Sequence, residues 1–218
     1  MPTFSGKKVL ITAGPTYEPI DPVRFIGNHS TGKMGYAIAE EFASRGAGVM
    51  LVSGPVNLPA PGPEIGLCRV TTASQMYEAV LEKCKEADIM VFAAAVADYR
   101  PISAAEQKIK KNTDSLTLEL VKNVDIAAEI GKIKLPGQFS VGFALETENE
   151  ETNALAKLYK KNFDLIVLNS LRDEGAGFGH DTNQIRILDA SGSVSFGLKS
   201  KQDVARDIVN TILDKMYA

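Results

Sequence analysis

One continuous segment, residues 9–52, constrains the fold more than any other part of the chain. Val9–Thr12 is a short apolar run rich in β-branched residues, which is typical of a buried parallel strand. Apolar residues recur at helical spacing through Thr31–Ser44, and a second apolar run follows at Val49–Val52. Because parallel strands need a crossover between them, the segment predicts a βαβ unit. A long loop, Gly14–Ser30, would leave its first strand.

Helices and strands alternate through most of the remaining chain. Further strands are expected at residues 68–71, 88–92, 140–144 and 163–168. Further helices are expected at residues 75–87, 126–133 and 202–215, and another should end at Asn162. Ser74 and Asp125 are the expected N-caps of two of these helices. This order predicts the α/β class, with a doubly wound, Rossmann-like, mostly parallel sheet in one domain over residues 1–218.

Two stretches depart from the alternation. Residues 100–122 contain a lysine-rich run and then an alternating pattern at Leu116–Val121, which together predict a small β-hairpin arm for dimerisation. Residues 172–198 begin with a polar, glycine-rich segment whose composition is typical of a mobile lid. The same stretch ends in a predicted hairpin about Ser191–Gly192.

Composition excludes several classes of protein. The formal net charge is −3 and Trp is absent, so we expect no nucleic-acid partner. No signal peptide and no apolar run long enough to span a bilayer are found, so no membrane association is expected. Cys68 and Cys84 are too few and too far apart for a metal motif, and they suggest a reduced, cytoplasmic setting.

The loop after the first strand is a candidate ligand site. In open parallel sheets, ligands bind beyond the carboxyl ends of the strands. This loop also ends at a helix N-terminus, where free backbone N–H groups favour an anion. Gly27, Gly32 and Lys33 have the spacing of a P-loop, but Met34 replaces the Ser or Thr that would bind magnesium. The G-x-G-x-x-G fingerprint is absent too, so a phosphate would bind by a different geometry.

Two later segments are further candidates. The small residues Ala93–Ala97 follow a predicted strand, and they fit either tight packing or the close approach of a ligand to the backbone. Asp98 comes directly after them, where an acid can face a ligand. Lys108 and Lys110 share one face of an extended segment, although most lysine runs are simply solvated surface.

Several segments, in this order, resemble one family of enzymes. They are Ile11–Thr16, Glu18–Arg24, Asn28–Gly35, Ala94–Tyr99, Lys108–Lys111 and Val141–Ala144. Over nearly the whole chain the pattern is similar to phosphopantothenate–cysteine ligase of the bacterial, CTP-dependent type. In many bacteria this ligase is fused behind a flavin-dependent decarboxylase. The present chain looks like a free-standing ligase domain, so the resemblance implies no flavin.

The resemblance implies a two-step reaction of coenzyme A biosynthesis. The carboxylate of 4′-phosphopantothenate attacks CTP to give an acyl-cytidylate and pyrophosphate, and the amine of L-cysteine then displaces CMP. The first step joins an anion to a polyanion, and a helix end contributes only about 0.3–2 kcal/mol. Lysines and Mg²⁺ are therefore expected. Related eukaryotic enzymes use ATP, and the lysine and lid patterns favour CTP here. The family also implies a homodimer whose sites borrow residues from the partner.

The resemblance also assigns roles to single residues. Lys108 is the expected catalytic lysine, which stabilises phosphate charge as the acyl-cytidylate forms. Asn28 is expected to hold the pantothenoyl amide and the acyl intermediate, because an amide donates and accepts hydrogen bonds without adding charge. The residues expected to bind the nucleotide together with Lys108 are Gly14, Ser30, Phe92, Ala93, Ala94, Asp98, Val124, Asp125, Ile126, Ala127, Phe143, Lys157 and Lys161. The metal ligands are not assigned.

Two other classes of function are alternatives. A short-chain-type NAD(P) oxidoreductase needs a glycine-rich first turn and a Tyr-x3-Lys pair, and no Tyr in the chain has Lys four residues later. A non-catalytic nucleotide-binding or interaction module would require Lys108 and Asn28 to be surface residues without a function. His29 and His180 fall on predicted loops and are assigned no role.

Overall fold

The protein is built around one eight-stranded sheet. The computed structural model describes residues 3–110, 114–146, 148–170 and 181–217. The strand order is β12-β11-β10-β9-β6-β1-β4-β5. The strands are β1 (Lys8–Ala13), β4 (Gly48–Ser53), β5 (Ile65–Arg69), β6 (Ile89–Phe92), β9 (Phe139–Glu146), β10 (Leu165–Ser170), β11 (Thr182–Asp189) and β12 (Gly192–Ser200). Six strands, from β10 to β5, are parallel, while β11 and β12 are antiparallel at one edge. The predicted α/β class and mostly parallel sheet are confirmed.

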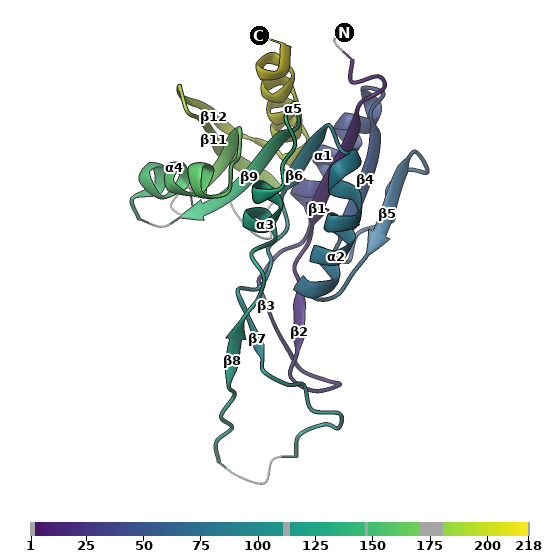
Figure 1. Cartoon of the computed structure of the whole chain (residues 1–218), viewed down its shortest axis with the longest axis vertical. Coiled ribbons are helices and arrows are strands. Elements are labelled where there is room, and N and C mark those ends of the chain that lie inside the picture. The colour runs from purple at the N-terminus through teal and green to yellow at the C-terminus, as the bar shows by residue number, and fades with distance from the viewer. Residues whose placement is uncertain (1–2, 111–113, 147, 171–180, 218) are drawn as a thin grey trace.

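Helices cover both faces of this sheet (Figure 1). On one face lie α1 (Lys33–Ser44) and α5 (Lys201–Tyr217), and on the other lie α2 (Ala73–Lys83), α3 (Ile126–Lys132) and α4 (Glu150–Lys160). Successive side chains of a strand point to opposite faces. In β1, Val9 and Ile11 therefore pack with α1 and α5, whereas Leu10 packs with α2 and α3. A central strand buried on both faces has to be apolar throughout, as β1 is.

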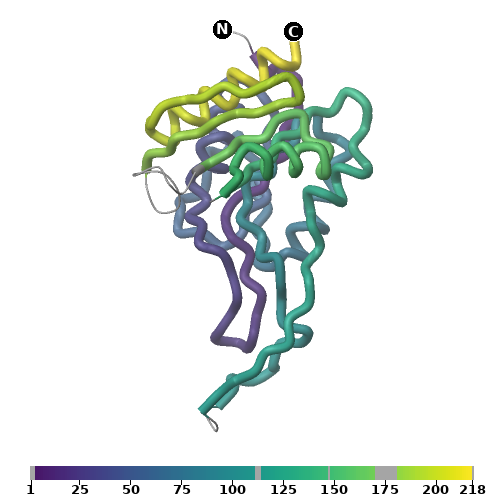
Figure 2. The backbone as a smooth tube through the Cα atoms, turned by 90° about the vertical axis from the view of Figure 1, so that its left-hand side faces the viewer, coloured from purple at the N-terminus to yellow at the C-terminus, as the bar shows by residue number. Residues whose placement is uncertain are grey.

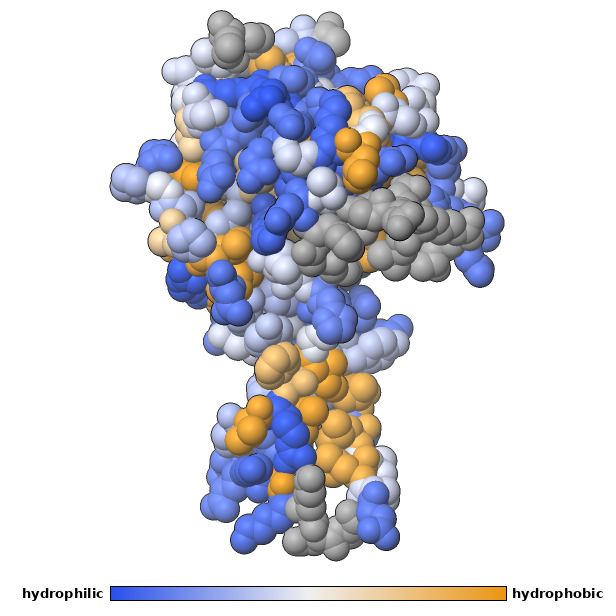
Figure 3. Space-filling view, turned by 180° about the vertical axis from the view of Figure 1, so that it is seen from behind, coloured by the Kyte–Doolittle hydropathy of each residue, from blue (hydrophilic) through white to orange (hydrophobic). Residues whose placement is uncertain are grey.

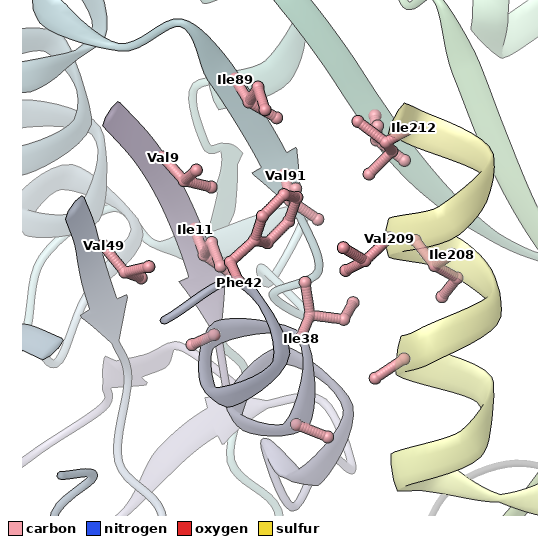
Figure 4. Close-up of a cluster of buried hydrophobic side chains, with 14 of the residues drawn as sticks. Val9, Ile11, Ile38, Phe42, Val49, Ile89, Val91, Ile208, Val209 and Ile212 are labelled. Carbon is pink, nitrogen blue, oxygen red and sulfur yellow. The ribbon is translucent and has the colours of Figure 1, made fainter. Parts of the chain in front are cut away.

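Figure 4 shows part of the core beneath α1 and α5, where branched aliphatic side chains pack around the ring of Phe42. Ile38 and Phe42 of α1 are completely buried against β1 and β6, and Ile208 and Ile212 of α5 are also completely buried in this cluster. The two helices therefore share one apolar layer over the sheet, which fixes where their N-termini lie relative to the strand ends.

Two small antiparallel ribbons project from one end of the sheet as a narrow arm (Figures 1 and 2). One pairs β2 (Tyr17–Pro19) with β3 (Phe25–Gly27), and the other pairs β7 (Tyr99–Pro101) with β8 (Leu120–Lys122). The segment Gly14–Ser30, expected to be a loop, thus contains a hairpin. Its strands are too short, and too rich in glycine and proline nearby, to produce an alternating pattern.

Several local expectations are corrected. The predicted strand Leu116–Val121 is confirmed only at its end, because Leu120 and Val121 pair within β8 and the residues before them do not form a strand. The cap of α2 is Thr72 rather than Ser74, since Thr72 and Gln75 form a complete capping box. The cap of α3 is Asp125, as predicted, and it accepts a hydrogen bond from Ala128 N at 3.1 Å.

The last part of the chain forms the antiparallel edge of the main sheet. The hairpin predicted about Ser191–Gly192 is confirmed, and its strands β11 and β12 are longer than expected. Residues 172–180 of the predicted lid lie outside the described residues, while residues 182–184, at its end, belong to β11. Within the part of the chain that is described, no helix is long and apolar enough to cross a membrane.

Replacing Gly35 with Ala should destabilise the protein, because α1 approaches the end of β1 closely at this residue. A Cβ at Gly35 would lie 2.6 Å from Ala13 Cβ, and overpacking of this kind costs about 1–3 kcal/mol. Gly197→Ala is the matched control, since a Cβ there meets nothing within 4 Å. Urea unfolding of both variants measures the difference. Equal midpoints for the two variants would contradict the close packing.

Replacing Asp189 with Asn should make stability less sensitive to acid. Burial raises the pKa of Asp189, but hydrogen bonds from Lys215 and Ser191 outweigh it and lower the pKa to about 2 from the ordinary value of 3.8. A lowered carboxyl pKa contributes stability above the unfolded pKa, and that contribution is lost as the pH falls from about 4 to about 2. The difference in the free energy of unfolding between the wild type and Asp189→Asn, measured by urea titration, should therefore decrease as the pH falls through that window. An unchanged difference across that window would contradict this role of Asp189.

Candidate functional site

The described residues form a pocket of about 620 Å³ where the carboxyl ends of β1, β6 and β9 meet the first turn of α1. The chain passes from β1 through α1 to β4 on one side, while β6 lies on the other side of β1. Open α/β sheets bind ligands at such switch points. The lining residues are Thr12, Asn28–Gly35, Phe92–Asp98, Asn123–Ala127, Phe143–Leu145, Lys157, Lys161, Phe163, Asn169, Asn183 and Lys201.

The first turn of α1 gives the pocket an anion-binding end. Gly32 precedes the helix in the left-handed region, with a φ of 76°, which glycine adopts without strain. The turn has no side-chain cap and no acidic residue. Its free backbone N–H groups, together with the helix dipole, therefore favour a bound anion. Ser30 lies beside them, and its Oγ accepts a hydrogen bond from Gly32 N at 3.3 Å.

The small-residue segment after β6 forms one wall of the pocket. Thr12 Oγ1 accepts a hydrogen bond from Ala94 N at 3.3 Å, and Thr16 Oγ1 accepts one from Ala97 N at 3.0 Å. Ala95 N donates to Gly14 O at 2.8 Å. These bonds hold the segment in an extended form against the end of β1. Its methyl side chains occupy little space, so a ligand can approach the backbone closely.

Asn28 is exposed beside this wall. Its Nδ2 donates to Val96 O at 2.9 Å, which orients the side-chain amide relative to the segment after β6. An amide offers an acceptor oxygen as well as its N–H donors. Asn28 can therefore position a polar, uncharged group of a ligand against the first turn of α1.

Two pairs of lysines line the pocket. Lys157 and Lys161 lie one turn apart on α4, and they form ion pairs with Glu146 at 2.6 Å and with Asp125 at 3.0 Å. Both lysines, which the resemblance assigns to the nucleotide, thus line the pocket. Their carboxylate partners hold the ammonium groups at the wall, and a phosphate would compete with those partners for the same charge.

The second pair consists of Lys33, from α1, and Lys201, from α5. Lys33 forms an ion pair with Asp181, and the side chain of Lys201 is almost completely buried. Burial lowers the pKa of Lys201, and the nearby charge of Lys33 lowers it further, while Asp181 opposes the shift. Like charges repel each other, and an anion bound near both ammonium groups would relieve that repulsion.

Most residues predicted from the sequence lie together in the lining of this pocket. They are Asn28, Ser30, Phe92, Ala93, Ala94, Asp98, Val124, Asp125, Ile126, Ala127, Phe143, Lys157 and Lys161. Gly14 lies behind the lining, where a Cβ on Gly32 would approach its Cα to 3.5 Å. Lys108 does not line the pocket of its own chain. It lies on the arm, beside a smaller hollow formed with Val23, Arg24, Ile109 and Lys110.

Three residues of the lining, Lys201, Asn169 and Asn183, are not predicted by any sequence pattern, and Lys33 has no predicted role. Asn183 Nδ2 donates to Asn169 Oδ1 at 3.2 Å, which joins two neighbouring strands at the pocket. Lys33 follows the glycine that starts α1, and this position was a usable signal. Lys201 begins a helix more than 150 residues later, so no local pattern links it to the site.

The carboxylates in the pocket lining fit a metal ion that enters the pocket bound to a substrate. Among the described residues, no group of three or more His, Cys, Asp or Glu side chains could hold a metal ion. Asp98 and Asp125 are the carboxylates in the pocket lining. Mg²⁺ commonly binds through one or two carboxylates together with the phosphates of a substrate. The donor set therefore fits a Mg²⁺–nucleotide better than a resident ion.

Comparison with known proteins agrees with this geometry. A family model described as the DNA/pantothenate metabolism flavoprotein C-terminal domain matches residues 4–216. The chain belongs to this family. A crystal structure of the C-terminal domain of the Coenzyme A biosynthesis bifunctional protein CoaBC is 40% identical, with a TM-score of 0.83, and the match covers 98% of this chain and 97% of that one. The domain fold is therefore shared over its whole length.

Two curated proteins that contain this family domain are longer than the chain. The bifunctional protein CoaBC of Haemophilus influenzae is 47% identical over 97% of this chain and 52% of its own length. A protein from an unknown prokaryotic organism, named Cysteine/Cysteine sulfinic acid decarboxylase, is 51% identical over 98% of this chain and 60% of its own length. The chain thus spans a little over half of each relative, and their full activities do not transfer directly.

Inorganic pyrophosphate should bind the pocket and raise the melting temperature. Mass action gives about 2.7 kcal/mol of stabilisation when the ligand is at 100 times its Kd. The rise should shrink as NaCl screens the lysines. Lys201→Met should reduce it, because one of the ammonium groups that line the pocket is removed. Lys83→Met, on the exposed surface of α2, is the control. An equal thermal shift in both variants would argue against an anion site at Lys201.

Proposed function

We propose that this chain is a phosphopantothenate–cysteine ligase that uses CTP and acts in the cytoplasm. The observation that carries the proposal is the pocket, in which the uncapped first turn of α1 and two pairs of lysines surround an oriented amide, Asn28. Such a site suits a reaction between a phosphorylated carboxylic acid and a nucleoside triphosphate. The family membership and the likeness to the C-terminal domain of CoaBC support the same reaction.

The first step makes the carboxylate of 4′-phosphopantothenate reactive. One carboxylate oxygen attacks the α-phosphorus of CTP, a new P–O bond forms, and the bond to the pyrophosphate oxygen breaks. Negative charge gathers on the transferring phosphate and on the leaving pyrophosphate. Preorganised cations and N–H groups stabilise this charge most strongly in the transition state. We assign that role to the first turn of α1, to the pocket lysines and to Lys108.

The second step joins L-cysteine to the activated acid. The cysteine nitrogen attacks the acyl carbon, loses a proton, and the bond to the CMP oxygen breaks. Asn28 would hold the acyl group during this attack, with its Nδ2 kept in place by Val96 O. The methyl groups of the segment after β6 leave room for the pantothenoyl chain along the backbone.

CTP and Mg²⁺ are the co-substrate and metal of this proposal. Asp98 and Asp125 are the pocket carboxylates available to a phosphate-bound Mg²⁺. When bound, the ion would neutralise phosphate charge and orient the triphosphate. Phe92, Phe143 and the turn Val124–Ala127 would enclose the base and ribose. No flavin takes part in either step.

We propose a homodimer in which Lys108 enters the pocket of the partner. It lies on the arm, outside the pocket of its own chain. Apolar residues gather on the surface of this arm (Figure 3). Val23 is 61% exposed, Ile102 is 58% exposed and Phe25 is 50% exposed. A second copy that covers these residues would bury apolar surface, and its pocket would receive Lys108.

The decisive experiment follows pyrophosphate release from the purified protein with 4′-phosphopantothenate and Mg²⁺, with CTP or ATP in parallel. A burst with CTP alone, and then turnover to CMP after L-cysteine is added, is the expected result. A burst only with ATP would keep the ligase and overturn the choice of nucleotide. The absence of pyrophosphate release from a folded dimer would contradict the ligase and favour a binding module.

Asn28→Ala separates the two steps. It should retain the pyrophosphate burst but slow the displacement of CMP by cysteine by about 10- to 100-fold, because a misplaced acyl group is no longer aligned with the attacking amine. Asn210→Ala, at an exposed position on α5, is the control and should behave as the wild type. Mass spectrometry of the quenched reaction should detect acyl-cytidylate in the Asn28 variant. Equal slowing of both steps would assign Asn28 to nucleotide binding instead.

A further inference from the structure

The arm contains a buried carboxylate that joins two segments far apart in the sequence. Asp21 lies in the turn between β2 and β3, and its side chain is 0% exposed. Oδ1 accepts hydrogen bonds from the backbone N–H groups of Val23 at 2.8 Å and Arg24 at 2.9 Å. These two bonds belong to the turn itself. One carboxylate oxygen therefore stabilises the turn of the hairpin, and the other is available to bind another segment.

The second oxygen binds the segment that carries Lys108. Asp21 Oδ2 accepts from Arg24 Nε at 3.0 Å, from Arg24 Nη2 at 2.6 Å, and from the backbone N–H of Ile109 at 3.1 Å. Arg24 Nη2 also donates to Ile109 O at 2.7 Å. The pair formed by Asp21 and Arg24 therefore holds both backbone polar groups of Ile109, a residue 85 or more positions later in the chain.

Holding both groups of Ile109 fixes the residue before it. The peptide unit is planar, so a bond to Ile109 N–H sets the orientation of the peptide that joins it to Lys108. The bond to Ile109 O sets the next peptide in the same way. The Cα of Lys108 lies in the first of these planes, so the bond to Ile109 N–H fixes the position from which the lysine side chain starts. A nearby bond from Ala105 N to Ile20 O, at 2.9 Å, ties the preceding part of the segment to the same hairpin.

The electrostatics agree with a permanent clamp. Burial opposes the ionisation of Asp21, but the N–H groups of Val23 and Ile109 and the Arg24 side chain outweigh it and hold the pKa of this carboxyl well below its usual range. Asp21 therefore stays charged at every working pH. Its charge also balances the cations Arg24, Lys108 and Lys110, which line one hollow on the arm.

We propose that Asp21 is a positioning residue for Lys108. Through Ile109 it holds the lysine in one direction, so that the ammonium group enters the pocket of the partner already aligned with the nucleotide phosphates. This inference rests on the proposed function, and it assigns a role to a residue that touches no substrate. The clamp removes the entropy that a lysine on a mobile arm would otherwise lose in the transition state.

The test is Asp21→Asn, which replaces one oxygen of the carboxylate with an NH₂ group. Asn keeps an oxygen to accept from Val23 and Arg24, but its NH₂ group cannot accept from Ile109 N–H or from the guanidinium. We expect acyl-cytidylate formation to slow by about 10- to 100-fold, with less than about a twofold change in the KM for CTP, because Lys108 acts in the transition state.

Asp189→Asn is the matched control. Asp189 is also a turn carboxylate; it accepts from the backbone N–H groups of Ser191 and Gly192, and it pairs with Lys215. It lies in the β11–β12 hairpin, outside the arm. The control should therefore lose stability without a loss of rate. An equal loss of rate in both variants would overturn the proposal.

A double-mutant cycle distinguishes positioning from general damage. If Asp21 acts through Lys108, the double variant Asp21→Asn/Lys108→Ala should form acyl-cytidylate at the rate of Lys108→Ala alone. Losses that multiply would overturn the inference, and so would a wild-type rate in Lys108→Ala. If Asp21→Asn does not fold, Arg24→Lys takes its place, because a lysine cannot bind Asp21 and Ile109 O in the same forked geometry.

Amide hydrogen exchange tests the clamp without relying on the ligase activity. The N–H of Ile109 should exchange more slowly in the wild type than in Asp21→Asn, while the amides of the β11–β12 turn should not change. If the wild type makes no acyl-cytidylate, the ligase proposal fails, and exchange at Ile109 still reports the clamp. Equal exchange at Ile109 in both proteins would overturn the clamp itself.

Discussion

The close approach of α1 to the end of β1 is the constraint on which the site depends. Gly35 allows it, because any side chain there would meet Ala13. The apolar layer shared by α1 and α5 holds both helices in place from behind (Figure 4). As a result the free N–H groups of α1 and the side chain of Lys201 open into one pocket. An anion-binding end thus arises from packing in the core rather than from a special loop.

The cations in the pocket are held by carboxylates of the protein itself. Lys157, Lys161 and Lys33 each have a carboxylate partner, and Lys201 is buried in the same pocket as Lys33. Exposed or half-exposed ion pairs contribute little to stability. Their value lies in holding mobile side chains near the place where a polyanion binds. A phosphate entering the pocket then meets cations that are already oriented, which lowers the cost of ordering them.

The arm is held by contacts different from those of the body. It has a stacked ring pair, Tyr17 and Phe25, with centroids 3.8 Å apart, and it has the network of Asp21, Arg24 and Ile109. Much of its apolar surface is exposed (Figure 3). A narrow ribbon cannot bury a core by itself, so polar bonds with specific geometry set its shape. That suits an element that presents a side chain to a second copy.

The sequence by itself determined the layers of this protein and most of the lining of its pocket. Local periodicity located the buried strands and the helices, since each face of β1 had to be apolar, and the order of the elements then predicted the parallel sheet. Resemblance located Asn28 and the residues after β6. Tertiary structure alone decided the rest. The β2–β3 hairpin, the partnership of Asp21 with Ile109 and the meeting of Lys33 with Lys201 join residues with no short-range pattern between them. Such contacts depend on how the sheet and its helices pack in space, and neighbouring residues along the chain do not record them.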